Sequence, residues 1–160
     1  MISTKAYELI DFAAIKLKQK NILSYKLDSE ILLSKALGKK REDILINLDQ
    51  KVNFIQSLKF NHLIMRRASR EPIAYIIKEK EFWSKVFIIN KHALIPRPET
   101  ELMVDRIIKI YKYQKISILD IGTGSGCILI SLLSELINSR GVGIDISKEA
   151  IFLAKKNAKK

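Results

Sequence analysis

The segment 117–133, "SILDIGTGSGCILISLL", places three glycines at alternate positions between two apolar runs. A glycine-rich turn between a strand and a helix lets a ligand approach the backbone, because no Cβ intervenes, and the helix N-terminus offers free N–H groups. The dinucleotide pattern G-x-G-x-x-G would need its third glycine at position 127, where the sequence has Cys127. The pattern D-x-G-x-G-x-G, which starts at Asp120, is satisfied instead. This spacing is typical of proteins that bind S-adenosylmethionine.

We name this turn the glycine loop, which comprises Gly122, Thr123, Gly124, Ser125 and Gly126. The next predicted strand ends in "GIDIS", where the Asp145 carboxylate could accept both hydroxyl protons of a ribose. The sequence therefore predicts that the glycine loop and Asp145 bind S-adenosylmethionine through its amino-acid and ribose portions. Two other interpretations stay open. The glycine loop could be a packed turn without a ligand, and Asp145 could cap the next helix, although Ser147 is already placed for that.

Apolar residues at helical spacing dominate the first seventy positions, which we predict to be all-helical. The predicted helices cover residues 4–19, 27–37, 42–47 and 51–69. Ser3 or Thr4 would cap the first helix, and Gly38 would end the second. We expect the following residues to form the apolar stripes of the first and last helices: Leu9, Phe12, Ala13 and Leu17; Val52, Ile55, Leu58, His62 and Met65.

In the second half of the chain the pattern of apolar residues is no longer uniformly helical. Residues 75–90 are rich in β-branched and aromatic side chains around a polar break at Ser84, which predicts two short strands. Further on, we predict a helix over 100–111, a strand over 116–121, a helix over 126–138, a strand over 141–146 and a helix over 148–159. The strand–helix–strand order predicts an α/β fold with a parallel sheet. The helix over 126–138 is apolar on nearly all sides, so we expect it to lack full cover.

Composition narrows the class of protein. The net charge of +12 is spread over the whole chain, so we expect no direct nucleic-acid binding. The uncharged stretch from Ile121 to Ser134 is too short and too polar to span a bilayer, and no secretory signal is expected, which favours a cytoplasmic protein. One cysteine excludes an intramolecular disulfide, and His62 and His92 lack partners at metal-ligand spacing. We therefore expect no metal site and no catalytic residue within these 160 residues.

Five segments together carry a family resemblance: "DSEILLSKALG", "EPIAYIIKEKEFW", "LIPRPETELMVD", "ILDIGTGSG" and "GIDISKEAI". In this order they resemble the N-terminal portion of the release-factor glutamine methyltransferases. The resemblance implies methyl transfer from S-adenosylmethionine to the amide nitrogen of the Gly-Gly-Gln glutamine of peptide chain release factors. It also implies a helical substrate-binding domain over 1–72, a β-hairpin connection over 73–95, and over 96–160 the start of a Rossmann-like class I methyltransferase domain with an incomplete sheet.

The same resemblance assigns roles to individual residues. It places the cofactor contacts on the glycine loop and Asp145. It makes one segment, which we name the PRPET segment, a possible border of the active site: Pro96, Arg97, Pro98, Glu99 and Thr100. At Lys78 the chain departs from the family, which usually has glycine there, and this puts the tightness of the hairpin in question.

A second departure concerns the family's Asn-Pro-Pro-Tyr motif, whose asparagine and proline carbonyl accept the amide protons of the substrate. None of the three prolines, Pro72, Pro96 and Pro98, follows an asparagine. We therefore expect these 160 residues to bind the cofactor weakly and to be inactive alone. Two alternatives remain, a non-catalytic remnant that binds release factor and an adenine amino-methyltransferase that shares the glycine loop.

Overall fold

A computed structural model describes residues 4–160, so the candidate cap Ser3 lies outside the described residues. The chain forms two compact units, which meet in the sequence between Ile77 and Lys78. Each unit is described below by itself.

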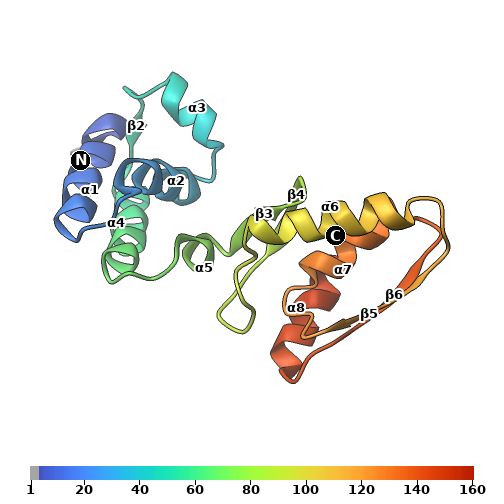
Figure 1. The fold of residues 1–160 in the computed structure, drawn as a ribbon. Coiled ribbons are helices and arrows are strands. Elements are labelled where there is room, and N and C mark those ends of the chain that lie inside the picture. Colours follow the sequence, from blue (N-terminus) through green and yellow to red (C-terminus); the bar gives the residue numbers. More distant parts are fainter. Residues whose placement is uncertain (1–3) are drawn as a thin grey trace. The chain divides into compact units, whose positions relative to one another are not determined.

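The first unit is helical, as predicted, with one small addition (Figure 1). Its helices are α1 (Ala6–Gln19), α2 (Tyr25–Leu37), α3 (Arg41–Ile46), α4 (Phe54–Ala68) and α5 (Ile73–Ile77). The addition is an antiparallel pair of two-residue strands, β1 (Thr4–Lys5) and β2 (Lys51–Val52). These strands shorten the predicted helices, so Thr4 pairs with Val52 and does not cap α1. Residues 75–77, expected to begin a strand, belong to α5.

Local side-chain chemistry sets the helix ends of this unit. The Asn53 carboxamide oxygen accepts the Gln56 N–H at 2.9 Å, and the Gln56 side chain accepts the Asn53 N–H at 3.2 Å. This reciprocal pair is a capping box, which explains why α4 begins at Phe54 and leaves Lys51 and Val52 to the strand. Gly38 ends α2 in the left-handed conformation with φ of 66°, as its position predicted.

The core of the first unit gathers around buried residues from all of its longer helices, including Leu9, Leu17, Leu32, Leu33, Phe60 and Ile64. The stripe predicted for α4 was wrong in direction. Ile55, Leu58 and Met65 are 77%, 53% and 59% exposed, and α4 instead buries Phe60, Leu63 and Ile64. Likewise Phe12 of α1 is 61% exposed. The periodicity was correct, but α4 carries apolar residues on two faces, and only packing selects the one that is buried.

A buried ion pair ties α2 to α4 within this core. Arg67 Nε donates to Asp28 Oδ2 at 2.6 Å, and the two side chains are only 16% and 4% exposed. The same carboxylate oxygen accepts the Ser24 hydroxyl at 2.8 Å. Arg67 also donates to the Glu71 carbonyl at 3.1 Å, so one guanidinium connects both helices to the segment that leads into α5.

The second unit begins with the predicted hairpin and continues as α/β structure (Figure 1). Its elements are β3 (Glu79–Phe82), β4 (Lys85–Ile88), α6 (Glu99–Tyr111), β5 (Ser117–Ile121), α7 (Cys127–Glu135), β6 (Arg140–Ile144) and α8 (Lys148–Ala158). Trp83 and Ser84 form the two-residue turn with φ of 51° and 54°. Phe82 and Phe87 pack edge to face across the hairpin, with ring centroids 6.3 Å apart.

Lys78 stands at the base of this hairpin with φ of 63°, in the left-handed region that favours glycine. The hairpin closes regardless, because the Lys78 carbonyl accepts the Ile89 N–H at 3.0 Å. The hairpin therefore tolerates lysine at position 78, although the left-handed backbone conformation of Lys78 is strained.

We expect Lys78→Gly to stabilise the second unit by up to about 1 kcal/mol. Relief of the left-handed strain is worth about 1–2 kcal/mol, and the larger unfolded-state entropy of glycine offsets about 0.5–1 kcal/mol of it. Urea unfolding followed by the fluorescence of the single tryptophan, Trp83, measures the change. Lys80→Gly is the matched control, because Lys80 lies inside β3 without a positive φ and should lose stability. Equal losses in both variants would contradict this account.

The parallel pairing of β5 with β6 is confirmed, with Leu119 opposite Val142 and Ile121 opposite Ile144. Helix α7 packs on one face of this two-stranded sheet, and Gly141 of β6 admits it, because a Cβ there would lie 2.5 Å from a Leu129 methyl carbon. The other face carries Leu119, Ile121 and Val142, which are 60–75% exposed.

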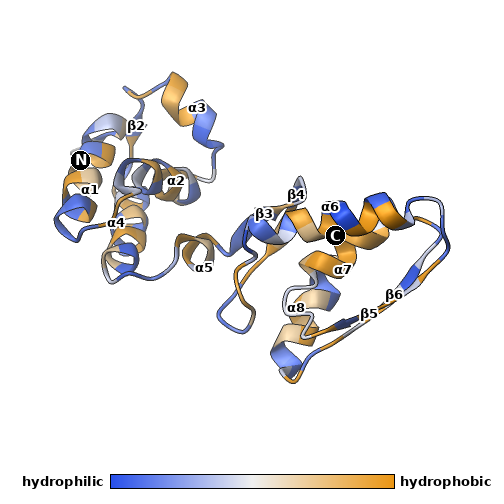
Figure 2. Ribbon diagram, viewed as in Figure 1, coloured by the Kyte–Doolittle hydropathy of each residue, from blue (hydrophilic) through white to orange (hydrophobic). Residues whose placement is uncertain are grey.

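The expectation that the helix over 126–138 lacks full cover was wrong for most of α7, although Ile137, in the predicted span but beyond the end of α7, is 81% exposed. Although α7 is apolar along its length (Figure 2), it packs between the sheet, α6 and α8. Leu129, Leu132 and Leu136 are at most 9% exposed. The opposite face of the sheet is one uncovered apolar surface of the second unit, and Leu94, Leu102 and Ile137 are also more than 70% exposed.

Candidate functional site

The glycine loop connects β5 to α7 and uses the conformational freedom of its three glycines. Gly122, Gly124 and Gly126 have φ of 79°, 56° and 79°, values that L side chains rarely adopt. The Gly122 and Thr123 N–H groups both donate to the Ile144 carbonyl at 2.8 and 2.9 Å, which fastens the loop to the end of β6. A Cβ on Gly126 would lie 2.9 Å from an Ile130 methyl carbon. A Cβ on Gly122 would meet no atom within 4 Å, so the surface over that glycine is open.

Two aspartates at the strand ends hold the loop from both sides. Asp120 accepts the Thr123 hydroxyl at 2.8 Å. Asp145 accepts the Gly124 N–H at 2.9 Å through one oxygen and the Ser147 N–H at 2.9 Å through the other. The Ser147 and Gly124 N–H groups hold the pKa of the Asp145 carboxyl below its usual range. The carboxylate is therefore kept ionised, and each oxygen retains a lone pair for a further donor.

Asp145 thus performs part of the capping role that was the alternative interpretation. Ser147 is nevertheless the N-cap of α8, because its hydroxyl accepts the Ala150 N–H at 3.1 Å. Asp145 is half-buried at the carboxyl end of β6, on the same edge of the sheet as the glycine loop.

The PRPET segment meets the glycine loop in a pocket of about 120 Å³. Pro96, Arg97 and Thr100 of the segment line it together with Gly122 to Ser125 of the loop. Pro98 and Glu99 are exposed and do not line the pocket; Pro98 is in helical conformation at the start of α6. The volume is below the roughly 300–1,000 Å³ of complete small-molecule sites, so the pocket can enclose part of a ligand the size of a nucleoside.

The hairpin turn is anchored by two glutamates. The Trp83 backbone N–H donates to Glu101 at 2.9 Å, and its indole N–H donates to Glu135 at 3.0 Å. Trp83 is thus a partly exposed turn residue, whereas Phe82 is 1% exposed and belongs to the hairpin core. Glu101, which directly follows the PRPET segment, therefore helps to position the hairpin turn. Sequence spacing could not predict these hydrogen bonds, because Trp83, Glu101 and Glu135 lie in the hairpin turn, in α6 and in α7.

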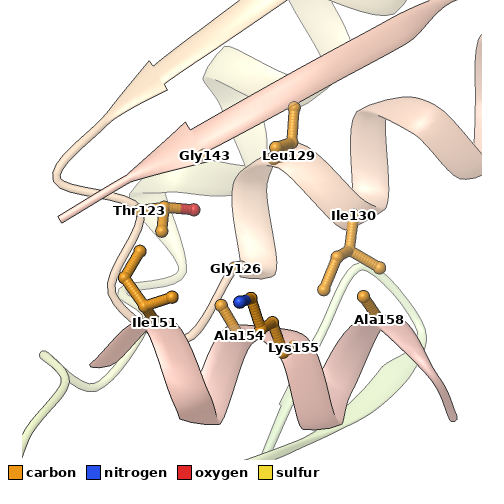
Figure 3. Close-up of a pocket in the computed structure, with 9 residues that line it drawn as sticks. All are labelled: Thr123, Gly126, Leu129, Ile130, Gly143, Ile151, Ala154, Lys155 and Ala158. Carbon is orange, nitrogen blue, oxygen red and sulfur yellow. The ribbon is translucent and has the colours of Figure 1, made fainter. Parts of the chain in front are cut away.

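A second cavity, of about 150 Å³, lies between α7 and α8 beneath β6 (Figure 3). Its lining is mainly apolar: Thr123, Gly126, Leu129, Ile130, Gly143, Ile151, Ala154, Lys155 and Ala158. Figure 3 shows Gly126 close to Ala154, and a Cβ on Gly126 would lie 3.2 Å from the Ala154 Cβ. We interpret this cavity as a packing groove between the helices. The buried Cys127 lies in the neighbouring pocket, and burial raises the pKa of its thiol, so it acts as a small apolar residue.

Residues 4–160 contain no helix that is long and apolar enough to cross a membrane. In the same range, no three histidine, cysteine or acidic side chains gather where they could hold a metal ion.

Comparison with known proteins places the two halves of the chain in two described domain families. Residues 8–77 match the PrmC N-terminal domain, and residues 112–160 match a methyltransferase domain. The glycine loop and the β5–α7–β6 unit are accordingly the beginning of a methyltransferase domain with an incomplete Rossmann-like sheet.

Relatives extend this assignment over nearly the whole chain. The chain is 42% identical to a release factor glutamine methyltransferase of Buchnera aphidicola, covering 94% of the chain and 54% of that protein. It is 38% identical to the enzyme of that name from Caulobacter vibrioides, covering 89% and 50%. A bifunctional methyltransferase of Rickettsia felis is 42% identical over 96% of the chain and 34% of its own length. The chain is similar to these methyltransferases over nearly its whole length and spans from a third to about half the length of these relatives.

Proposed function

We propose that this chain carries the release-factor-binding domain and the cofactor-binding half of an S-adenosylmethionine-dependent glutamine methyltransferase. The observation that carries the proposal is the pocket shared by the PRPET segment and the glycine loop. The segment expected to border the active site and the loop expected to contact the cofactor line the same cavity. The named relatives support methyl transfer to release factors as the reaction.

The residues present fit one side of this cofactor. The open surface over Gly122 lets a ligand reach the backbone, and the ionised Asp145 retains lone pairs for ribose hydroxyls. When bound, S-adenosylmethionine supplies an electrophilic methyl group on a positively charged sulfur. The glycine loop would hold its amino-acid portion, and Pro96, Arg97 and Thr100 would shield the pocket from water.

The acceptor half of the reaction lies outside what these residues can supply. An amide nitrogen is a weak nucleophile because its lone pair is delocalised into the carbonyl, so both amide protons need fixed acceptors that aim it at the methyl group. The PRPET segment offers one carboxylate, Glu99, which is exposed and outside the pocket. We therefore place substrate alignment in residues that this chain does not contain.

For the partner, we propose the first unit as the surface that holds a peptide chain release factor, in the cytoplasm, without direct contact to nucleic acid. The exposed apolar stripe of α4, formed by Phe54, Ile55, Leu58 and Met65, supports this proposal, because an apolar helix face of this extent favours a protein partner. A remnant that only binds release factor would use the same stripe. The match to the PrmC N-terminal domain favours either form over an adenine amino-methyltransferase.

We expect weak binding of S-adenosylmethionine to the 160-residue chain, with a dissociation constant of about 100 micromolar or higher, and no detectable binding by Asp145→Ala. The alanine removes the ribose acceptor and also releases the Gly124 and Ser147 N–H groups. Isothermal titration calorimetry measures both. Asp105→Ala is the matched control, because Asp105 pairs with Lys109 on the exposed side of α6. Low-micromolar binding, or binding that survives in Asp145→Ala, would contradict the assignment.

A further inference from the structure

Asn157, near the end of α8, makes an unusually complete set of hydrogen bonds for a residue outside the pocket. Its side chain is buried, with 6% exposure. Its carboxamide oxygen accepts the Ile88 N–H at 2.8 Å, and its nitrogen donates to the Ile88 carbonyl at 3.0 Å. The second N–H of the same nitrogen donates to the Ser125 carbonyl at 2.8 Å. The carboxamide therefore uses both of its donors and its acceptor.

The geometry of the hairpin explains why Ile88 needs this partner. In an antiparallel pair, residues alternate between those that exchange backbone bonds with the partner strand and those whose N–H and C=O face outward. Ile88 lies opposite Glu79, and the next residue, Ile89, bonds back to Lys78. The Ile88 backbone groups therefore face the outer edge of β4, where Asn157 pairs with them as a neighbouring strand would.

The third bond connects this edge to the glycine loop. Ser125 belongs to the loop and lines the cofactor pocket, whereas β4 leads through residues 89–95 into the PRPET segment, which also lines it. Ala93 on this connection is buried, and a Cβ on Gly124 would lie 3.9 Å from the Ala93 Cβ. One carboxamide thus joins the glycine loop to the strand that leads into the PRPET segment.

We propose that Asn157 is a positioning residue of the cofactor pocket, which holds the glycine loop at a set distance from the strand that delivers the PRPET segment. It does not line the pocket and acts through Ser125 and Ile88. The effect of Asn157 on cofactor binding rests on the proposed function, but the coupling of the glycine loop to the hairpin does not. Only glutamine carries the same donors and acceptor, and its additional methylene would displace them; aspartate lacks the donors and would turn a charge toward two carbonyl oxygens, and alanine offers nothing.

The experiment compares Asn157→Asp and Asn157→Ala with a matched control, Leu153→Ala. Leu153 is buried one turn earlier on the same helix, so its truncation loosens α8 without touching loop or hairpin bonds. Asn157→Gln, which keeps the amide chemistry but displaces it by one methylene, serves as the milder variant should the others fail to fold. Amide hydrogen exchange is followed for Ile88, for Gly124 and Gly126 in the loop, and for Leu119 in β5 as an internal reference.

We expect the Asn157 variants to accelerate exchange of the Ile88 and loop amides at least tenfold relative to Leu119, with a smaller change in Asn157→Gln. In Leu153→Ala this ratio should stay within about twofold. The dissociation constant for S-adenosylmethionine should rise at least tenfold in the Asn157 variants and less than threefold in the control.

An unchanged exchange ratio would overturn the proposal, whether or not the wild-type chain binds the cofactor. A raised ratio with unchanged cofactor affinity would overturn the positioning role for the pocket. If the wild-type chain showed no affinity for S-adenosylmethionine, the proposed function would fail, while the exchange ratio would still decide whether Asn157 couples the loop to the hairpin.

Discussion

A polypeptide of these 160 residues should transfer no measurable methyl label from S-adenosylmethionine to a release factor. Reversion from positioned to unpositioned reactants is worth about 7–11 kcal/mol, which corresponds to at least about a 10⁵-fold loss of rate. The pocket of about 120 Å³ can hold part of the cofactor, but no asparagine, glutamine, aspartate or glutamate lines it to supply a carboxamide or carboxylate acceptor for the substrate amide. Radiolabelled cofactor and purified release factor, with the label counted on the protein, test this directly.

Two controls make this result informative. The Buchnera aphidicola relative should label the release factor under the same conditions. A chimera that joins residues 1–160 to the part of that relative beyond the match should regain label transfer, because the two proteins are 42% identical over the shared portion. Robust transfer by the 160 residues alone would mean that the acceptor groups lie within them. Failure of the chimera alongside an active relative would point to a defect in the cofactor half.

Asp28→Ala should destabilise the first unit by about 3–5 kcal/mol, the usual loss when one partner of a buried ion pair is removed. The Arg67 guanidinium, 16% exposed, would lose its carboxylate partner, and the Ser24 hydroxyl would lose its acceptor. Urea unfolding followed by far-ultraviolet circular dichroism reports on this unit because its described part is largely helical.

Asp49→Ala is the matched control for that substitution. Asp49 pairs with Lys5 at 2.8 Å, but its side chain is 78% exposed, so the loss should be no more than about 1 kcal/mol. The double variant Asp28→Ala, Arg67→Met should recover part of the stability lost in the single variant, because no buried charge is then left without a partner. Equal stability losses in Asp28→Ala and Asp49→Ala would show that burial of the pair has no energetic consequence.

Most of the features that depend on neighbouring residues can be predicted from the sequence alone. Helix ends at Gly38 and Ser147, the turn at Ser84 and the parallel β5–α7–β6 unit all follow from local conformational preference and apolar spacing. The glycine loop was recognisable for the same reason, because a left-handed turn between strand and helix restricts which residues can occupy it.

Tertiary packing selects which of two apolar helix faces is buried and which groups distant in the chain form hydrogen bonds. Helix α4 buries Phe60 and leaves Ile55 exposed, because its neighbours in the first unit cover one apolar face and leave the other open. In the sequence Asn157 is an ordinary polar residue near a helix end. In the structure its side chain bonds to Ile88 at the edge of β4 and to Ser125 of the glycine loop. Hydrogen bonds of this kind join residues that are far apart in the chain. Their partners are backbone groups, which every residue carries, so a pattern of side chains along the sequence cannot predict them.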